Sequence, residues 1–175
     1  MPLDAIYKVY HTQGRHDAGF NALDLASDML GRSKSSRLYN QLVKKNQIFN
    51  SVNAYVTASL DPGLMVIQGN LNQGVSIEEG DVAIQNVLDD FIKNPVSEEE
   101  LTKVKNQAES TLVFSEVELL NRAMNLAFAA NAGNVEYANQ ESGNIQVVTT
   151  LDVANQSRKI LMKENCSTMY YRAEN

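Results

Sequence analysis

Apolar and polar positions alternate in two regions of the first half of the chain. Residues 5–12 are rich in aromatic and β-branched side chains, and Gly14 ends that segment. Residues 52–60 alternate regularly, and the turn sequence Asp61-Pro62-Gly63 separates them from the apolar run 64–67. The pattern therefore predicts one strand at the start of the chain and a β-hairpin further on.

Between the strand and the hairpin, the apolar residues recur every three or four positions, which is the period of a helix. We expect a first helix over Asp17–Leu30, with Asp17 as its N-cap and Gly31 as its C-cap. A second helix is expected to begin at Ser35 or Ser36 and to end near Asn46.

Three further helices have a recognisable start, in which a serine or threonine is followed three residues later by an acidic residue. These starts are Ser76, Ser97 and Thr149. The pattern that begins at Ser97 continues to Gly133, and its apolar residues from Met124 to Phe128 are expected in the core.

A weakly helical segment over 137–146 and a last strand over 168–172 complete the prediction. One strand, two helices, a hairpin, several helices and a final strand are typical of an α+β protein. We therefore predict a single domain over residues 1–175, a mainly antiparallel sheet covered on one face by helices.

Composition narrows the choice of partners. The chain has 175 residues, 43% of them hydrophobic, which is enough for one sizeable core. With 15 basic and 21 acidic residues its net charge is -6, so we expect neither nucleic acid nor an anionic membrane as a partner. No apolar run approaches the roughly 20 residues of a membrane span. We expect a soluble protein, cytoplasmic or periplasmic, whose targeting signal, if it has one, would lie upstream.

Residues for metal binding or nucleophilic catalysis are scarce. The chain has one cysteine, Cys166, and two histidines, His11 and His16, whereas a zinc site needs three or four converging ligands. The segment Gly31–Ser36 lacks the second glycine of a phosphate-binding loop and is explained by helix caps. Glu98–Glu100 are explained by a helix dipole. No catalytic residue, metal ligand or cofactor is predicted in this segment.

Four landmarks in order nevertheless carry a family resemblance. They are Gly31 followed by Ser36–Leu42, the turn Asp61–Gly63, and the segments Val96–Leu101 and Val148–Val153. Together they resemble the pitrilysin/insulinase family of zinc peptidases over nearly the whole chain. The chain looks like the C-terminal, non-metal-binding half of a subunit related to the mitochondrial processing peptidase.

The resemblance implies a mitochondrial processing peptidase-like metallohydrolase fold, in which homologous domains pair and enclose a peptide chamber. It implies that zinc is held by an inverted His-x-x-Glu-His motif in the N-terminal half of the parent protein or in a partner. The implied partners are that N-terminal domain, a second subunit in a homo- or heterodimer, and an extended peptide substrate.

The resemblance also points to substrate-assisting positions. Active relatives carry an arginine and, seven residues later, a tyrosine that hold the substrate and stabilise the oxyanion. Here those positions are Val43 and Asn50, so the pair is substituted. Arg37, Lys44 and Lys45 are nearby cations and candidate contacts.

The leading interpretation is therefore a non-catalytic, substrate-enclosing domain that binds extended peptides. Its parent would be a zinc-dependent endopeptidase or a degenerate relative, and the segment alone would not be an enzyme. One alternative is an inactive assembly subunit, like the core proteins of the respiratory cytochrome complex. A free-standing peptide-binding module is the other.

Overall fold

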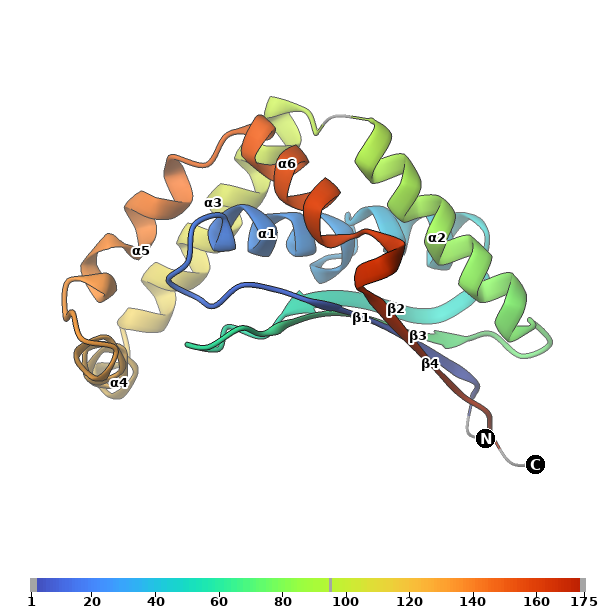
Figure 1. Ribbon diagram of the computed structural model, residues 1–175, viewed down its shortest axis with the longest axis horizontal. Coiled ribbons are helices and arrows are strands. Elements are labelled where there is room, and N and C mark those ends of the chain that lie inside the picture. Colours follow the sequence, from blue (N-terminus) through green and yellow to red (C-terminus); the bar gives the residue numbers. More distant parts are fainter. Residues whose placement is uncertain (1–2, 95, 174–175) are drawn as a thin grey trace.

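A single antiparallel sheet organises the chain. A computed structural model describes residues 3–94 and 96–173; residues 1, 2, 95, 174 and 175 lie outside the described part. The sheet has the strand order β2-β3-β1-β4. Its strands are β1 (Ala5–His11), β2 (Phe49–Val56), β3 (Leu64–Leu71) and β4 (Cys166–Tyr171). The predicted strands and hairpin are confirmed, and the first and last strands lie side by side (Figure 1).

The first two predicted helices exist; the ends of the first differ from the prediction, whereas the second is helical from Arg37 to Lys45, as expected. They are α1 (Phe20–Ser27), which continues into the wider turn η1 (Asp28–Arg32), and η2 (Tyr39–Lys45). Asp17 is not the N-cap, because its carboxylate accepts a hydrogen bond from the Gly14 amide instead. Gly31 lies inside η1 and is not a C-cap. A Cβ atom there would collide with the backbone nitrogen of Ala54, so this glycine lets η1 pack closely on β2.

The three helix starts in the second half are confirmed. Ser76 and Ser97 each accept a hydrogen bond from the amide three residues on, and Thr149 and Asp152 form a complete capping box. The helices are α2 (Ile77–Lys93), α3 (Glu98–Glu116), α4 (Leu119–Asn131), α5 (Tyr137–Gln146), α6 (Thr150–Ile160) and the short η3 (Lys163–Asn165).

The second half of α3, with α4 and α5, forms an arm that reaches past the ends of the strands (Figure 1). The long helix expected up to Gly133 is interrupted after Glu116, and α4 contacts mainly α3 and α5. Met124 and Phe128 are 45% and 63% exposed, so their predicted place in the core is wrong. The spacing correctly indicated that one side of this helix is apolar. It did not show that the rest of the protein fails to cover that side.

The core lies between the other helices and one face of the sheet. Ile6, Met65 and Ile67 of the sheet pack there against α1, η1, η2, α2 and α6. All described helices lie on that side or beyond the strand ends, so the opposite face is open (Figure 1). The predicted α+β class, with helices on one face, is confirmed. No helix in the described residues is long and apolar enough to cross a bilayer.

Candidate functional site

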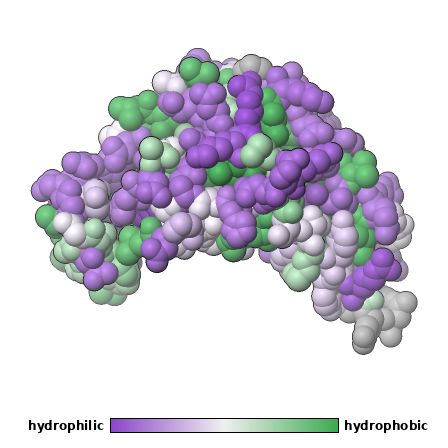
Figure 2. Space-filling model, viewed as in Figure 1, coloured by the Kyte–Doolittle hydropathy of each residue, from purple (hydrophilic) through white to green (hydrophobic). Residues whose placement is uncertain are grey.

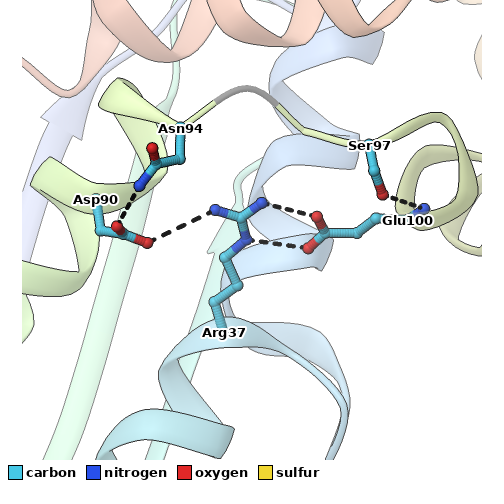
Figure 3. Close-up of polar contacts among 5 residues, drawn as sticks. All are labelled: Arg37, Asp90, Asn94, Ser97 and Glu100. Carbon is cyan, nitrogen blue, oxygen red and sulfur yellow. Dashed lines mark hydrogen bonds and ion pairs between the residues drawn. The ribbon is translucent and has the colours of Figure 1, made fainter.

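Arg37 lies between the end of α2 and the start of α3 (Figure 3). Its guanidinium donates two hydrogen bonds to the Glu100 carboxylate, at 3.1 and 2.7 Å, and lies 4.8 Å from the centre of the Phe91 ring. Asp90 is the second carboxylate, at 4.0 Å. Bidentate pairing in a fixed plane is the strong form of this ion pair. In the described structure Arg37 therefore joins the η2 region to two helices.

The other family-implied positions follow Arg37 along the chain. Val43 is half-buried in η2 and packs against the edge of the core. Lys44 and Lys45 are exposed in the last turn of that helix. Asn50 is exposed at a bulge near the start of β2, where the register with β3 shifts. An aliphatic side chain donates no hydrogen bond, so Val43 cannot bind a substrate as an arginine at this position would.

The open face of the sheet carries an ordered set of side chains that alternates with those facing the helices, and of this set Ala5 and Val66, in the two central strands, are themselves buried. The strand registers align it in rows across β2, β3, β1 and β4. The rows are Tyr55, Val66, Val9 and Ser167; Asn53, Gln68, Tyr7 and Met169; and Ser51, Asn70, Ala5 and Tyr171. We call them the open-face rows, and none of these residues is charged.

Two hydrogen bonds brace the open-face rows. Gln68 donates to the Tyr7 hydroxyl at 3.2 Å, and Asn70 donates to the Ser51 hydroxyl at 3.0 Å. The outer residues are the most accessible, with Tyr55 44% and Met169 58% exposed. The underside of the molecule is hollowed between the arm and the far end of the sheet (Figure 2).

The covered face of the same strands holds a buried charge. Lys8 lies between Ile6 and Tyr10 on that face, is only 5% exposed, and pairs with Asp81 of α2 at 2.8 Å. Burial, with a smaller effect from Cys166, raises the pKa of Tyr10 far above its usual value. Burial also raises the pKa of Tyr170. Lys8 and Tyr10 are enclosed beneath the helices, so they stabilise the fold and are not placed to meet a substrate, whereas Tyr170 is 48% exposed.

A cavity of about 1060 Å³ lies between the arm and the body. Across it, Arg15 pairs with Glu141 at 2.7 Å, and the His16 ring stacks on Tyr137 with 4.1 Å between centroids. Asp24 of α1 faces this cavity, and burial raises its pKa to about 6. His16 thus packs from the body against the arm.

The residues present do not fit a zinc ion. Within residues 3–94 and 96–173, no three His, Cys, Asp or Glu side chains come together in a way that could hold a metal. His11 ends β1 and is exposed, whereas His16 stacks on α5. The described residues therefore supply no set of zinc ligands.

Sequence reasoning missed the Lys8–Asp81 pair and the open-face rows. The alternation within residues 5–12 contained part of the signal, since residues two apart share a face of a strand. It could not show which face the helices cover. The partner of Arg37 is 63 residues away in sequence, so no local pattern could indicate it.

A family model matches more than half of the chain. Residues 2–108 match the family described as the peptidase M16 inactive domain. A comparison with curated proteins returns no match.

Three solved structures share the fold. A protease from Helicobacter pylori has a TM-score of 0.91 and 17% identity, over 99% of this chain and 42% of that chain. The inactive peptidase domain of a Bordetella parapertussis protein has a TM-score of 0.89 and 21% identity, over 97% and 92%. A chain of complex III2 from Candida albicans has a TM-score of 0.81 and 15% identity, over 97% and 43%. The chain thus spans less than half of the first and third relatives.

Proposed function

Because this chain belongs to the inactive-domain family of the M16 (pitrilysin) peptidases, we propose that it is the non-catalytic, substrate-enclosing domain of a zinc-dependent peptidase. Its task is to form part of the wall against which an extended peptide is held. Zinc and the water-activating glutamate then belong to a homologous domain, in the same chain or in a second subunit. The substrate comes to this domain as a polypeptide strand.

The open face of the sheet is the observation that carries the proposal. A sheet packed on one face only exposes a broad surface together with two edge strands, here β2 and β4. Edge strands bind extended peptides through main-chain hydrogen bonds, which do not depend on the peptide's sequence. Among the described residues, no group of three His, Cys, Asp or Glu side chains that could hold a metal ion lies beside this surface.

The substitutions at Val43 and Asn50 concern which domain supplies the arginine and tyrosine that hold the substrate. We propose that a partner domain supplies the missing arginine and tyrosine. The intact parent protein, assayed as a purified homo-oligomer, tests this: the double variant Val43→Arg, Asn50→Tyr should raise peptide hydrolysis only when the partner's own pair is removed. Hydrolysis by a homo-oligomer that has no such pair in any domain would rule out the partner-supplied pair.

An assembly role is the second candidate, and the arm favours it. Phe114, Val117 and Leu119 are 76%, 79% and 84% exposed, which is unusual for large apolar side chains. Such a surface suits contact with another protein domain. Two relatives are more than twice as long as this chain, which supports pairing with a further domain.

The intact mass of the polypeptide that carries this segment in its source cell, with peptide mapping, separates the two candidates. The proposal expects a mass well above 19.4 kDa and an upstream His-x-x-Glu-His motif, or a co-purifying subunit that has one. The same large mass without the motif in any subunit would favour the inactive scaffold. A lone 175-residue product that binds peptides as a monomer would favour the free-standing module.

A further inference from the structure

The open face of the sheet has a composition that restricts what it binds. We infer that it selects uncharged stretches of extended peptide with aromatic or aliphatic side chains and rejects basic or acidic stretches. This inference rests on the proposed function, since it names the substrate class of the same wall.

The open-face rows contain no charged side chain, although the chain as a whole has many. The chain has 36 charged side chains among 175 residues, 15 basic and 21 acidic, yet the open-face rows contain none. The same strand β1 places Lys8 on the covered face, although a charge costs more there. Lys8 therefore lies on the covered face, where a ligand cannot reach it. The open-face rows, where a ligand would lie, have no charged side chain.

A charged ligand residue would gain little on such a surface. A lysine or glutamate pressed against the rows would lose hydration and meet no opposite charge. A tyrosine, leucine or amide side chain would instead bury apolar area against Tyr55, Met169 and Tyr171, about half of whose surfaces are exposed. The overall charge of -6 is carried by residues outside the open-face rows, and physiological salt screens such charges beyond about 8 Å.

The spacing of the rows fits a strand-like ligand. Successive rows are two residues apart along each strand, or roughly 6.7 Å, which is also the spacing of alternate side chains in an extended peptide. The hydrogen bonds from Gln68 to Tyr7 and from Asn70 to Ser51 hold these side chains before a ligand arrives. Tyrosines lose little conformational entropy on contact because they have only two side-chain torsions.

The test compares matched peptides and matched variants of the whole chain by isothermal titration calorimetry. One blocked peptide contains Leu, Tyr, Gln and Asn, and two others replace each Leu with Lys or with Glu. Met169→Lys adds a charge to the open face. Thr168→Lys, the neighbour in β4 on the other face, is the control, and both residues are exposed.

We expect the neutral peptide to bind at least about tenfold more tightly than either charged one. Met169→Lys should weaken its binding about tenfold, and Thr168→Lys less than about twofold. Equal or tighter binding of the Lys peptide, still sensitive to Met169→Lys, would overturn the selectivity and leave the peptide wall intact. If no peptide binds, the proposed function fails as well. Self-association abolished by Met169→Lys without peptide binding would assign the face to a second copy and overturn the inference.

Discussion

The two faces of the sheet are formed by the same strands but differ in burial and in charge. Along β1, residues Ile6, Lys8 and Tyr10 are enclosed by helices, while Tyr7 and Val9 lie on the uncovered side. The covered face contains a buried ion pair, and the open face contains aromatic and amide side chains but no charge. Burial alone therefore does not explain where the charges lie, since the accessible face is the neutral one. The covered face stabilises the fold, and the open face is left for a partner.

The largest loss of stability should come from a substitution in the core of the covered face. Ile67→Ala removes a fully buried side chain and leaves a cavity, so the free energy of unfolding should fall by about 2–5 kcal/mol. Urea denaturation measures it. The neighbour Gln68 is the matched control, because Gln68→Ala on the open face should cost less than about 1 kcal/mol. Equal losses at the two positions would contradict the contrast.

The buried ion pair should have the next largest effect. Lys8→Met keeps most of the side-chain volume but leaves Asp81 unpaired, so the protein should lose about 2–3 kcal/mol of stability. Adding Asp81→Asn removes the unpaired charge and should restore most of the loss. A double variant no more stable than Lys8→Met would show that packing of the lysine stem, and not its charge, matters.

Asp24 tests the cost of a charge within the helix layer. Its pKa is raised from 3.8 to about 6, chiefly by burial and secondarily by Asp28, so the folded state holds a proton that the unfolded state has released. Stability should therefore fall as the pH rises from about 4 to 6. Asp24→Asn should remove this dependence and add about 1–2 kcal/mol at pH 7. Urea denaturation at pH 4, 5, 6 and 7 checks it, and an unchanged pH profile would contradict it.

The smallest effect should come from the open face itself. Met169→Ser removes an apolar side chain that is 58% exposed, so stability should change by less than about 0.5 kcal/mol. Peptide binding should weaken in the same variant. A stability loss comparable to that of Ile67→Ala would mean that the open face is part of the core.

Local patterns predicted much of the fold, because its helix starts and strands depend on neighbouring residues. Ser76, Ser97 and Thr149 begin helices as expected, since each cap involves groups only three positions apart. The role of Gly31 was different from the prediction, because the constraint comes from Ala54 in another element.

Long-range contacts account for what the sequence did not reveal. Arg37 and Glu100 meet only after three elements have packed, and Lys8 is buried only because α2 lies over β1. The apolar stripe of α4 was assigned to a core that the arm does not have. Where a helix lies relative to the body decides whether its apolar side is core or surface, and its period does not show this. Val43 and Asn50 remain a prediction from the family resemblance.

The most direct measurement of the account is the map of backbone amides that respond to the neutral peptide in a two-dimensional NMR titration of the whole chain. Binding to the open face predicts shifts at Asn53, Gln68, Tyr7 and Met169 and at the adjoining rows, with the arm and the Arg37–Glu100 contact unchanged. Shifts confined to the arm or to the cavity beside Asp24, with the open-face rows unaffected, would contradict it.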